Sequence, residues 1–276
     1  MKKYLLLISL LLLSCSTQQE VVKEKGKVIH LDLPLPVDSP YAYSPHLKLG
    51  LPIDSDPTDD YIIIRHQYAL SYNKNLNVSN WVAWQLNKDW FGNVKRYRGN
   101  FLIDALLPPD FYRVTHNDYT RSGFDRGHMV RSKERTATKE DNISTFYMTN
   151  ILPQKPDLNQ GVWADLENYL ERLCKKEDKE LYIIAGGIFR TKKKVNNKVT
   201  IPDSCFKIVV VLDRGQTLKD ITEQTQIIAV VMPNINGTRK NNWETYKTTI
   251  NRIESSTGYV FLSRVDKNVR EFLKRK

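Results

Sequence analysis

Residues 122–168 read SGFDRGHMVRSKERTATKEDNISTFYMTNILPQKPDLNQGVWADLEN, and they hold most of the polar groups with recognisable chemistry. The stretch contains a histidine beside an acid and an arginine, then an amide-rich run, then an acid on a predicted helix; in chain order these are Asp125, Arg126, His128, Asn150, Gln154, Asn159, Gln160 and Glu167. Such groups provide a general base, oxygen ligands for a cation, and positive charge for phosphate.

The segments on either side of this stretch predict a sheet covered by helices. Residues 61–65 form a β-branched run, and alternating apolar residues follow at 68–73 and 79–87. Residues 161–179 have helical apolar spacing. Three apolar runs, at 181–189, 205–213 and 226–234, predict strands, and residues 242–262 predict a helix and a short strand. We therefore expect an α+β fold with a mixed, largely antiparallel central sheet and packed helices.

Charge and cysteine content narrow the possible partners. The 276 residues carry a formal net charge of +11, with a sequence pI of about 9.4. This balance indicates a polyanionic partner, whether nucleic acid, anionic lipid or acidic glycan, although a merely basic surface is the alternative. Cys174 and Cys205 are expected to be buried free thiols, with a disulfide between them as the alternative.

The N-terminus is predicted to be a lipoprotein signal peptide over residues 1–14. Lys2 and Lys3 precede an apolar run over residues 4–13, which ends in Leu-Leu-Ser-Cys. This ending resembles a bacterial lipobox, in which Cys15 becomes the lipidated first residue; a short membrane anchor and an ordinary cleaved signal are the alternatives. The expected location is the bacterial cell envelope, lipid-anchored at the outer membrane or surface, or secreted.

Residues 15–57 are predicted to be a Pro-rich tether, and residues 58–276 the folded domain. Prolines stand at positions 34, 36, 40, 45, 52 and 57, and such segments are extended and bury little apolar surface. His30 and His46 fall in this tether and are expected to be solvated. The glycine pair at 186–187 is expected to be a bulge or turn, because it lacks the context of a phosphate loop.

The central stretch, residues 122–168, is suited to cleavage of a phosphodiester. His128 has an unperturbed pKa near neutrality and is able to deprotonate water. A hard cation such as Mg²⁺ prefers oxygen ligands and keeps several waters, so one amide oxygen with Glu167 nearby suffices. Arg126 and Arg98 are candidates for binding phosphate oxygens. The sequence has no HExxH, paired-histidine zinc spacing, two-metal carboxylate cluster or GxSxG.

Three motifs carry a family resemblance: Asp125-Arg-Gly-His128, residues 149–154 (TNILPQ) and residues 157–161 (DLNQG), followed by Trp163 and Glu167. Together they resemble the DNA/RNA non-specific endonucleases, the family of Serratia nuclease and mitochondrial endonuclease G. The resemblance extends loosely from Tyr61 to the C-terminus. It implies a ββα-metal (His-Me finger) active site in a mixed sheet, and hydrolysis of DNA and RNA to 5′-phosphorylated products.

The resemblance also implies roles for single residues. His128 is then the general base, Asn159 the direct Mg²⁺ ligand (Mn²⁺ being a possible substitute), and Glu167 the group that orients a metal-bound water. Asp125 and Arg126 flank the base. The residues expected to support the site or bind substrate are Asn150, Gln154 and one upstream arginine, either Arg96 or Arg98, of which Arg98 is favoured.

Two other functions remain open at this stage. The chain is alternatively a non-catalytic, polyanion-binding envelope lipoprotein on a degenerate nuclease fold, or a phosphodiesterase that acts on small nucleotides. Cleavage of plasmid DNA and RNA only in the presence of metal distinguishes the nuclease from both. The preference between DNA and RNA and the oligomeric state do not follow from the sequence.

Overall fold

The computed structural model describes residues 22–24, 27–31 and 44–276. The predicted signal peptide, Cys15 and much of the predicted tether lie outside these ranges, and of His30 the structure describes the backbone only. No helix within the described ranges combines the length and the apolar character needed to cross a membrane.

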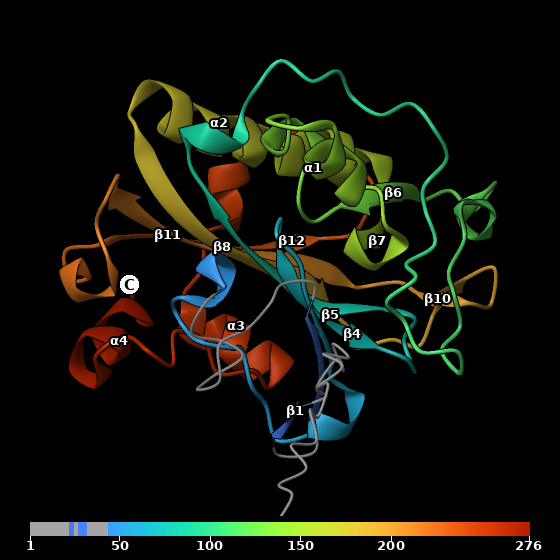
Figure 1. Cartoon of the computed structure of the whole chain (residues 1–276), viewed down its shortest axis with the longest axis horizontal. Helices are drawn as coiled ribbons and strands as arrows, with labels where there is room; N and C mark the ends of the chain where they lie inside the picture. The colour runs from blue at the N-terminus through green and yellow to red at the C-terminus, as the bar shows by residue number, and fades with distance from the viewer. Residues whose placement is uncertain (1–21, 25–26, 32–43) are drawn as a thin grey trace, which may run out of the picture.

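Within the described residues, eight strands form one sheet in the order β1-β2-β3-β4-β5-β8-β11-β12 (Figure 1). Only β2 and β3 pair in parallel, and the other neighbours are antiparallel. The strands are β1 (Val22–Glu24), β2 (Lys27–Leu31), β3 (Tyr61–Ile64), β4 (Ala69–Asn73), β5 (Val78–Leu86), β8 (Lys179–Ile188), β11 (Ser204–Asp213) and β12 (Gln226–Pro233). The expected mixed, largely antiparallel sheet of an α+β fold is confirmed.

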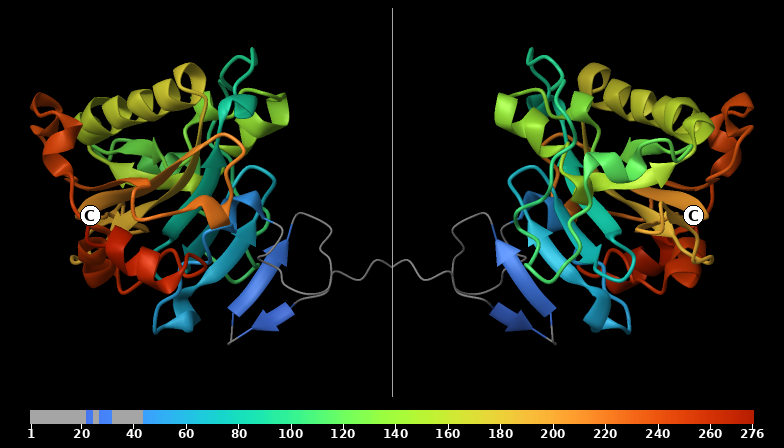
Figure 2. Two further views of the ribbon diagram at one scale, coloured as in Figure 1. Left: turned by 90° about the vertical axis from the view of Figure 1, so that its left-hand side faces the viewer. Right: turned by 90° about the vertical axis from the view of Figure 1, so that its right-hand side faces the viewer.

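Helices cover both faces of the sheet (Figures 1 and 2). On one face, α2 (Trp163–Lys176) packs its leucines into a cluster that includes Trp84 of β5. On the other face, α3 (Ile250–Thr257) and α4 (Lys267–Leu273) pack into a cluster that includes Trp81. Side chains alternate between the faces of a strand, so Trp81 and Trp84, three residues apart on β5, pack into two different cores. A short helix, α1 (Lys139–Ser144), precedes the second half of the central stretch.

Two short ribbons stand apart from the large sheet. One pairs β6 (Asp125–His128) with β7 (Ile151–Gln154), and the other pairs β9 (Lys194–Val195) with β10 (Val199–Thr200). Ile151 and Leu152 belong to the same core cluster as the leucines of α2. The first ribbon is therefore packed on the α2 side of the sheet.

The folded part of the chain starts earlier than the expected boundary at residue 58. Leu47 and Leu49 are buried in the core beside α3 and α4, because this segment covers apolar side chains that the helices leave open. The expectation that His46 is solvated is wrong. Its Nε2 lies 2.8 Å from the carbonyl oxygen of His66, and its Nδ1 accepts a hydrogen bond of 3.1 Å from the Gln85 amide.

Three further expectations are corrected or settled. Gly186 forms neither a bulge nor a turn but lies within β8, where a Cβ would stand 2.3 Å from the carbonyl oxygen of Asn80. The expected C-terminal strand is a single bridge between Ile53 and Val260, and α4 was not anticipated. Cys174 and Cys205 are buried free thiols, as expected.

Candidate active site

The first ribbon and α2 together form a ββα unit. Asp125 pairs with Gln154, and His128 pairs with Ile151, so β6 and β7 are in register over their whole length. A Cβ at Gly127 would lie 2.0 Å from the side-chain oxygen of Gln154, so glycine is needed for this close approach. The chain then continues from β7 through the short segment Leu158–Val162, which is kinked at Gly161, into α2.

His128 is a neutral base in a partly enclosed aromatic setting. Its ring lies 5.2 Å from the ring of Phe101 and 5.1 Å from that of Phe146, centroid to centroid. Its Nε2 is buried and has no hydrogen-bond partner among the described residues. Burial, with the charges of Arg96 and Arg131, lowers the pKa of His128 to about 3. The imidazole is therefore unprotonated at neutral pH, as a general base requires.

Asn159 lies on the kinked segment Leu158–Val162 and is held by Asp125 of β6. Its Nδ2 donates to Asp125 Oδ2 at 2.9 Å, and Gln160 Nε2 donates to the same oxygen at 2.7 Å. This contact fixes the amide of Asn159 with its nitrogen toward the acid. Within the described chain, no hydrogen bond is made to Asn159 Oδ1, so that oxygen is available to a ligand.

Glu167 lies one turn into α2 and is buried, with 5 % of its surface exposed. Arg131, just beyond β6, places its Nε 3.4 Å from Glu167 Oε2 and donates to the side chain of Asn168 at 2.9 Å. Sequence reasoning did not single out Arg131. The only signal was the unusual charge of residues 129–137 after the histidine.

Arg96, not the favoured Arg98, is the upstream arginine that faces the histidine. Its guanidinium lies 4.8 Å from the Phe146 ring centroid and donates to the Ser132 hydroxyl, and its charge contributes to the lowered pKa of His128. Arg98 is exposed and makes no side-chain hydrogen bond or ion pair within the described residues. The two positions are too close in sequence for pattern alone to choose between them.

Arg126 is directed toward the 3₁₀ turn at His116–Tyr119. Its Nη2 donates to the His116 carbonyl oxygen at 2.7 Å and to the Thr120 hydroxyl at 3.3 Å. The guanidinium also lies 5.9 Å from the Phe101 ring centroid. Arg126 thus stays at the edge of the aromatic group that surrounds His128.

Asn150 and Gln154 do not line the site, which corrects their expected role in substrate binding. Both side chains are fully buried. Asn150 donates to the carbonyl oxygens of Val130 and Thr145 and accepts from the Val130 amide, each at 2.9 Å. Gln154 donates to Cys205 Sγ at 3.4 Å. Asn150 stands just before β7 and Gln154 ends it, and these contacts support the ribbon from within.

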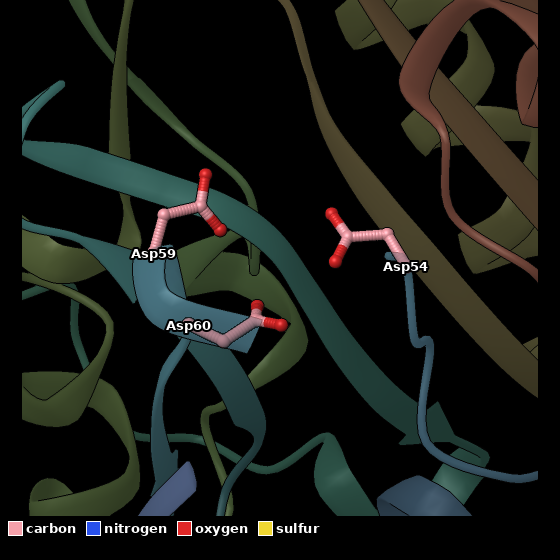
Figure 3. Close-up of side chains that lie close together, drawn as sticks. All are labelled: Asp54, Asp59 and Asp60. Carbon is pink, nitrogen blue, oxygen red and sulfur yellow. The ribbon is translucent and has the colours of Figure 1, made fainter. Parts of the chain in front are cut away.

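Within the ranges that the structure describes, the one cluster of three or more candidate metal ligands of the His, Cys, Asp and Glu types lies outside the ββα unit. It consists of Asp54, Asp59 and Asp60, before and at the start of β3 (Figure 3). Asn73 donates to Asp59 at 2.8 Å, and the Tyr259 hydroxyl donates to Asp60 at 2.9 Å. These hydrogen bonds tie Asp59 to β4 and Asp60 to the segment after α3, which gives both acids a structural role just before β3.

The donor set of the ββα unit fits a hard cation that takes few protein ligands. Asn159 contributes a neutral oxygen with no hydrogen bond from the described chain, and Glu167 contributes a carboxylate from the helix that follows. Mg²⁺ favours such oxygen ligands and retains several waters. No hydrogen bond or ion pair in the described part of the chain joins His128 to either residue, so the base stands separate from these oxygen donors.

A paired β-ribbon that runs into a helix, with the histidine on the first strand and amide and acid side chains after the second, defines the ββα-metal class of nucleases. The model of the DNA/RNA non-specific endonuclease family matches residues 45–268. The match covers most of the chain, and the chain belongs to this family of nucleases, which is a metal-dependent family in general.

Comparisons with individual proteins agree with this assignment. A nuclease of Nostoc sp. (strain PCC 7120 / SAG 25.82 / UTEX 2576) is 47% identical over 238 residues, which is 84% of this chain and 86% of that protein. Human mitochondrial endonuclease G is 27% identical over 214 residues, covering 73% and 69%. The fold resembles the crystal structure of the EndoG/EndoGI complex, with a TM-score of 0.69, 23% identity and coverage of 84% and 96%.

Proposed function

We propose that this nuclease hydrolyses phosphodiester bonds of both DNA and RNA, uses Mg²⁺ (or Mn²⁺ as a substitute), and leaves 5′-phosphorylated products. The observation that carries the proposal is the placement of His128, packed against two aromatic rings on the ribbon that leads into Asn159 and Glu167. The net charge of +11 supports a polyanionic substrate.

His128 accepts the proton of the attacking water. Its Nε2 is enclosed by the protein, so the proposal assigns the accepting lone pair to Nδ1. The rings of Phe101 and Phe146 hold the imidazole in place and limit its contact with solvent. A positioned general base of this kind contributes about 10²–10⁴-fold to a rate.

Arg96 neutralises charge on the substrate. Attack on phosphorus increases the negative charge on the phosphoryl oxygens, and a guanidinium is well shaped to bind them. Arg96 is held against the Phe146 ring, on which the His128 ring also packs, so one aromatic side chain orders both groups. Arg126 and Asp125 flank the base, Arg126 by adding positive charge and Asp125 by orienting Asn159.

Asn159 Oδ1 is the proposed direct ligand of Mg²⁺, and Glu167 is the proposed support for water around it. When bound, the cation supplies positive charge that stabilises the developing charge and the leaving oxygen. Asp125 performs a separate task, because its contact with Asn159 Nδ2 keeps the amide oxygen directed away from the acid. Arg131 keeps the Glu167 carboxylate in place from the solvent side.

The experiment is to incubate the purified chain with plasmid DNA, with RNA and with a model phosphodiester, each in Mg²⁺ or in EDTA, and to label the ends of the polymer products. The proposal expects loss of both polymers only with metal, and termini that a 5′-phosphate-dependent ligase joins. Binding without cleavage indicates a non-catalytic polyanion-binding protein. Hydrolysis of a model diester with intact polymers indicates an enzyme for small nucleotides. Either result contradicts the proposal.

The location of the protein is a separate proposal, which rests on the sequence alone. The lysines and the apolar run before Cys15 support an N-terminal lipid on this cysteine. The anchored chain would act at the outer membrane or surface of a bacterial cell, or be released from it, and would meet nucleic acid outside the cytoplasm.

A further inference from the structure

Lys207 is a fully buried lysine in the core beneath the ββα unit. It lies in β11 on the same face as Cys205 and Val209, which is the face covered by α2. Its Nζ is 4.1 Å from the ring centroid of Trp163 and has no hydrogen-bond partner among the described residues. An ammonium group removed from water destabilises a fold unless a partner compensates for it, so its surroundings need explanation.

The partner of Lys207 is the carboxylate that the proposed mechanism uses. Lys207 Nζ lies 3.6 Å from Glu167 Oε1, whereas Arg131 Nε lies 3.4 Å from Oε2. Each oxygen of Glu167 therefore faces a different cation. The Arg131 side chain is 21 % exposed and stands at the solvent edge, whereas the Lys207 side chain is 0 % exposed and lies below α2.

A second buried acid competes for the same positive charge. Glu134 is 1 % exposed, and its Oε2 accepts a hydrogen bond of 3.1 Å from Trp84 Nε1. Burial and the charge of Glu167 raise the pKa of Glu134, and Lys207 opposes this effect. Burial also raises the pKa of Glu167, and Lys207 and Arg131 oppose this effect. Two acids near each other in a dry setting do not both stay ionised without nearby cations.

We propose that Lys207 is a positioning residue of the nuclease reaction: its buried ammonium group fixes one oxygen of the Glu167 carboxylate from beneath α2, while Arg131 faces the other oxygen from the solvent edge. The proposal rests on the function proposed above for Glu167. The charged groups that face Glu167 are Lys207 from β11, Arg131 and Glu134 from the segment after β6, and Glu171 of α2 through Arg131. With an apolar residue at position 207, Arg131 would be the one cation left to pair with Glu167 among the groups named here, and Glu134 would still be nearby.

The test uses the full chain and the substitution Lys207→Met, which removes the cation and keeps the length of the side chain. Cleavage with Mg²⁺ is expected to fall about 10–100-fold, the usual effect of losing a partner of a metal-supporting residue. The acidic limb of the pH–rate profile is expected to move to higher pH. Infrared spectra of metal-free Lys207→Met at pH 7 are expected to show a stronger protonated-carboxyl band than spectra of the wild type. This added intensity should be absent from Lys207→Met/Glu167→Gln.

Charge compensation and a matched control separate this role from a purely structural one. Lys207→Met/Glu134→Gln removes the competing acid, so part of the lost rate should return. Lys274→Met removes another buried lysine, whose Nζ lies 2.8 Å from Glu254 Oε1 on the α3 and α4 side of the sheet, and should leave the pH profile unchanged. Circular dichroism checks that each variant folds.

Several outcomes overturn the proposal. One is a Lys207→Met protein with the wild-type pH profile and no added carboxyl band. Another is that the rate losses of Lys207→Met and Glu167→Gln multiply in the double variant, as losses from independent residues do. If Lys207→Met does not fold, Glu134→Gln alone decides: the acidic limb should move to lower pH, and an unchanged limb contradicts the proposal. If the wild type cleaves neither polymer, the proposed function fails, whereas the infrared comparison still tests the Lys207–Glu167 link.

Discussion

Asn150→Ala tests whether the buried amide of the TNILPQ motif supports the base strand or contacts substrate. The side chain satisfies three backbone groups, the amide and carbonyl of Val130 and the carbonyl of Thr145, each at 2.9 Å. Alanine leaves all three without this partner in a buried place, at about 1 kcal/mol each. The free energy of unfolding should therefore fall by about 3 kcal/mol.

The assay is chemical denaturation at 25 °C, followed by steady-state cleavage below the unfolding transition. Because Val130 lies two residues after His128, loosening this segment should lower kcat and leave KM for nucleic acid nearly unchanged. Asn117→Ala is the control, since Asn117 is exposed and its side chain makes no hydrogen bond within the described residues. A stability loss below about 1 kcal/mol together with a raised KM would show that Asn150 binds substrate.

Three further predictions concern pH, phosphate binding and the N-terminus. Burial lowers the pKa of His46 from 6.5 to about 3, so as pH falls the unfolded chain binds this proton before the folded chain does. The free energy of unfolding should therefore fall as pH drops from about 6.5 toward 3, and it should fall less steeply in His46→Gln. Equal slopes in the two proteins would refute the assignment. Arg96→Ala should lower kcat/KM at least tenfold and Arg98→Ala less than threefold, each a rough expectation for losing or keeping a charged phosphate contact; the reverse order would restore Arg98. Cys15→Ala should move the protein from the membrane to the soluble fraction, and a wild type that is already soluble and unacylated rules out the anchor.

The strands and helix α2 were predictable because their apolar periodicity reflects burial directly. β-branched runs such as residues 61–64 became strands, and the leucines of α2 recur at helical spacing on the buried face. The ββα unit followed from motifs that place His128, Asn159 and Glu167 on consecutive elements. These parts depend on local pattern, which one sequence carries.

Other parts depended on contacts between distant segments. The burial of Asn150 and Gln154 was not predictable, because polar side chains normally indicate a solvated position. Lys207 approaches Glu167 only because β11 runs beneath α2, and no spacing in the chain encodes that approach. The one available signal was a lone lysine in an otherwise apolar run at residues 205–212.

The N-terminal boundary shows the same limit. Prolines made residues 44–57 resemble a tether, whereas Leu47 and Leu49 complete a core built by helices from the other end of the chain. His46 then became buried with both ring nitrogens paired to backbone groups.

The most direct test of the central claim compares metal titrations of His128→Ala and Asn159→Ala, followed by both activity and calorimetry. The account predicts that His128→Ala loses about two to four orders of magnitude in rate, the size expected for a general base, and still binds Mg²⁺ or Mn²⁺. Asn159→Ala should bind metal more weakly and recover part of its activity at higher metal concentration. Loss of metal binding in His128→Ala with intact binding in Asn159→Ala would reverse the two assignments, and near wild-type activity in both would contradict the account altogether.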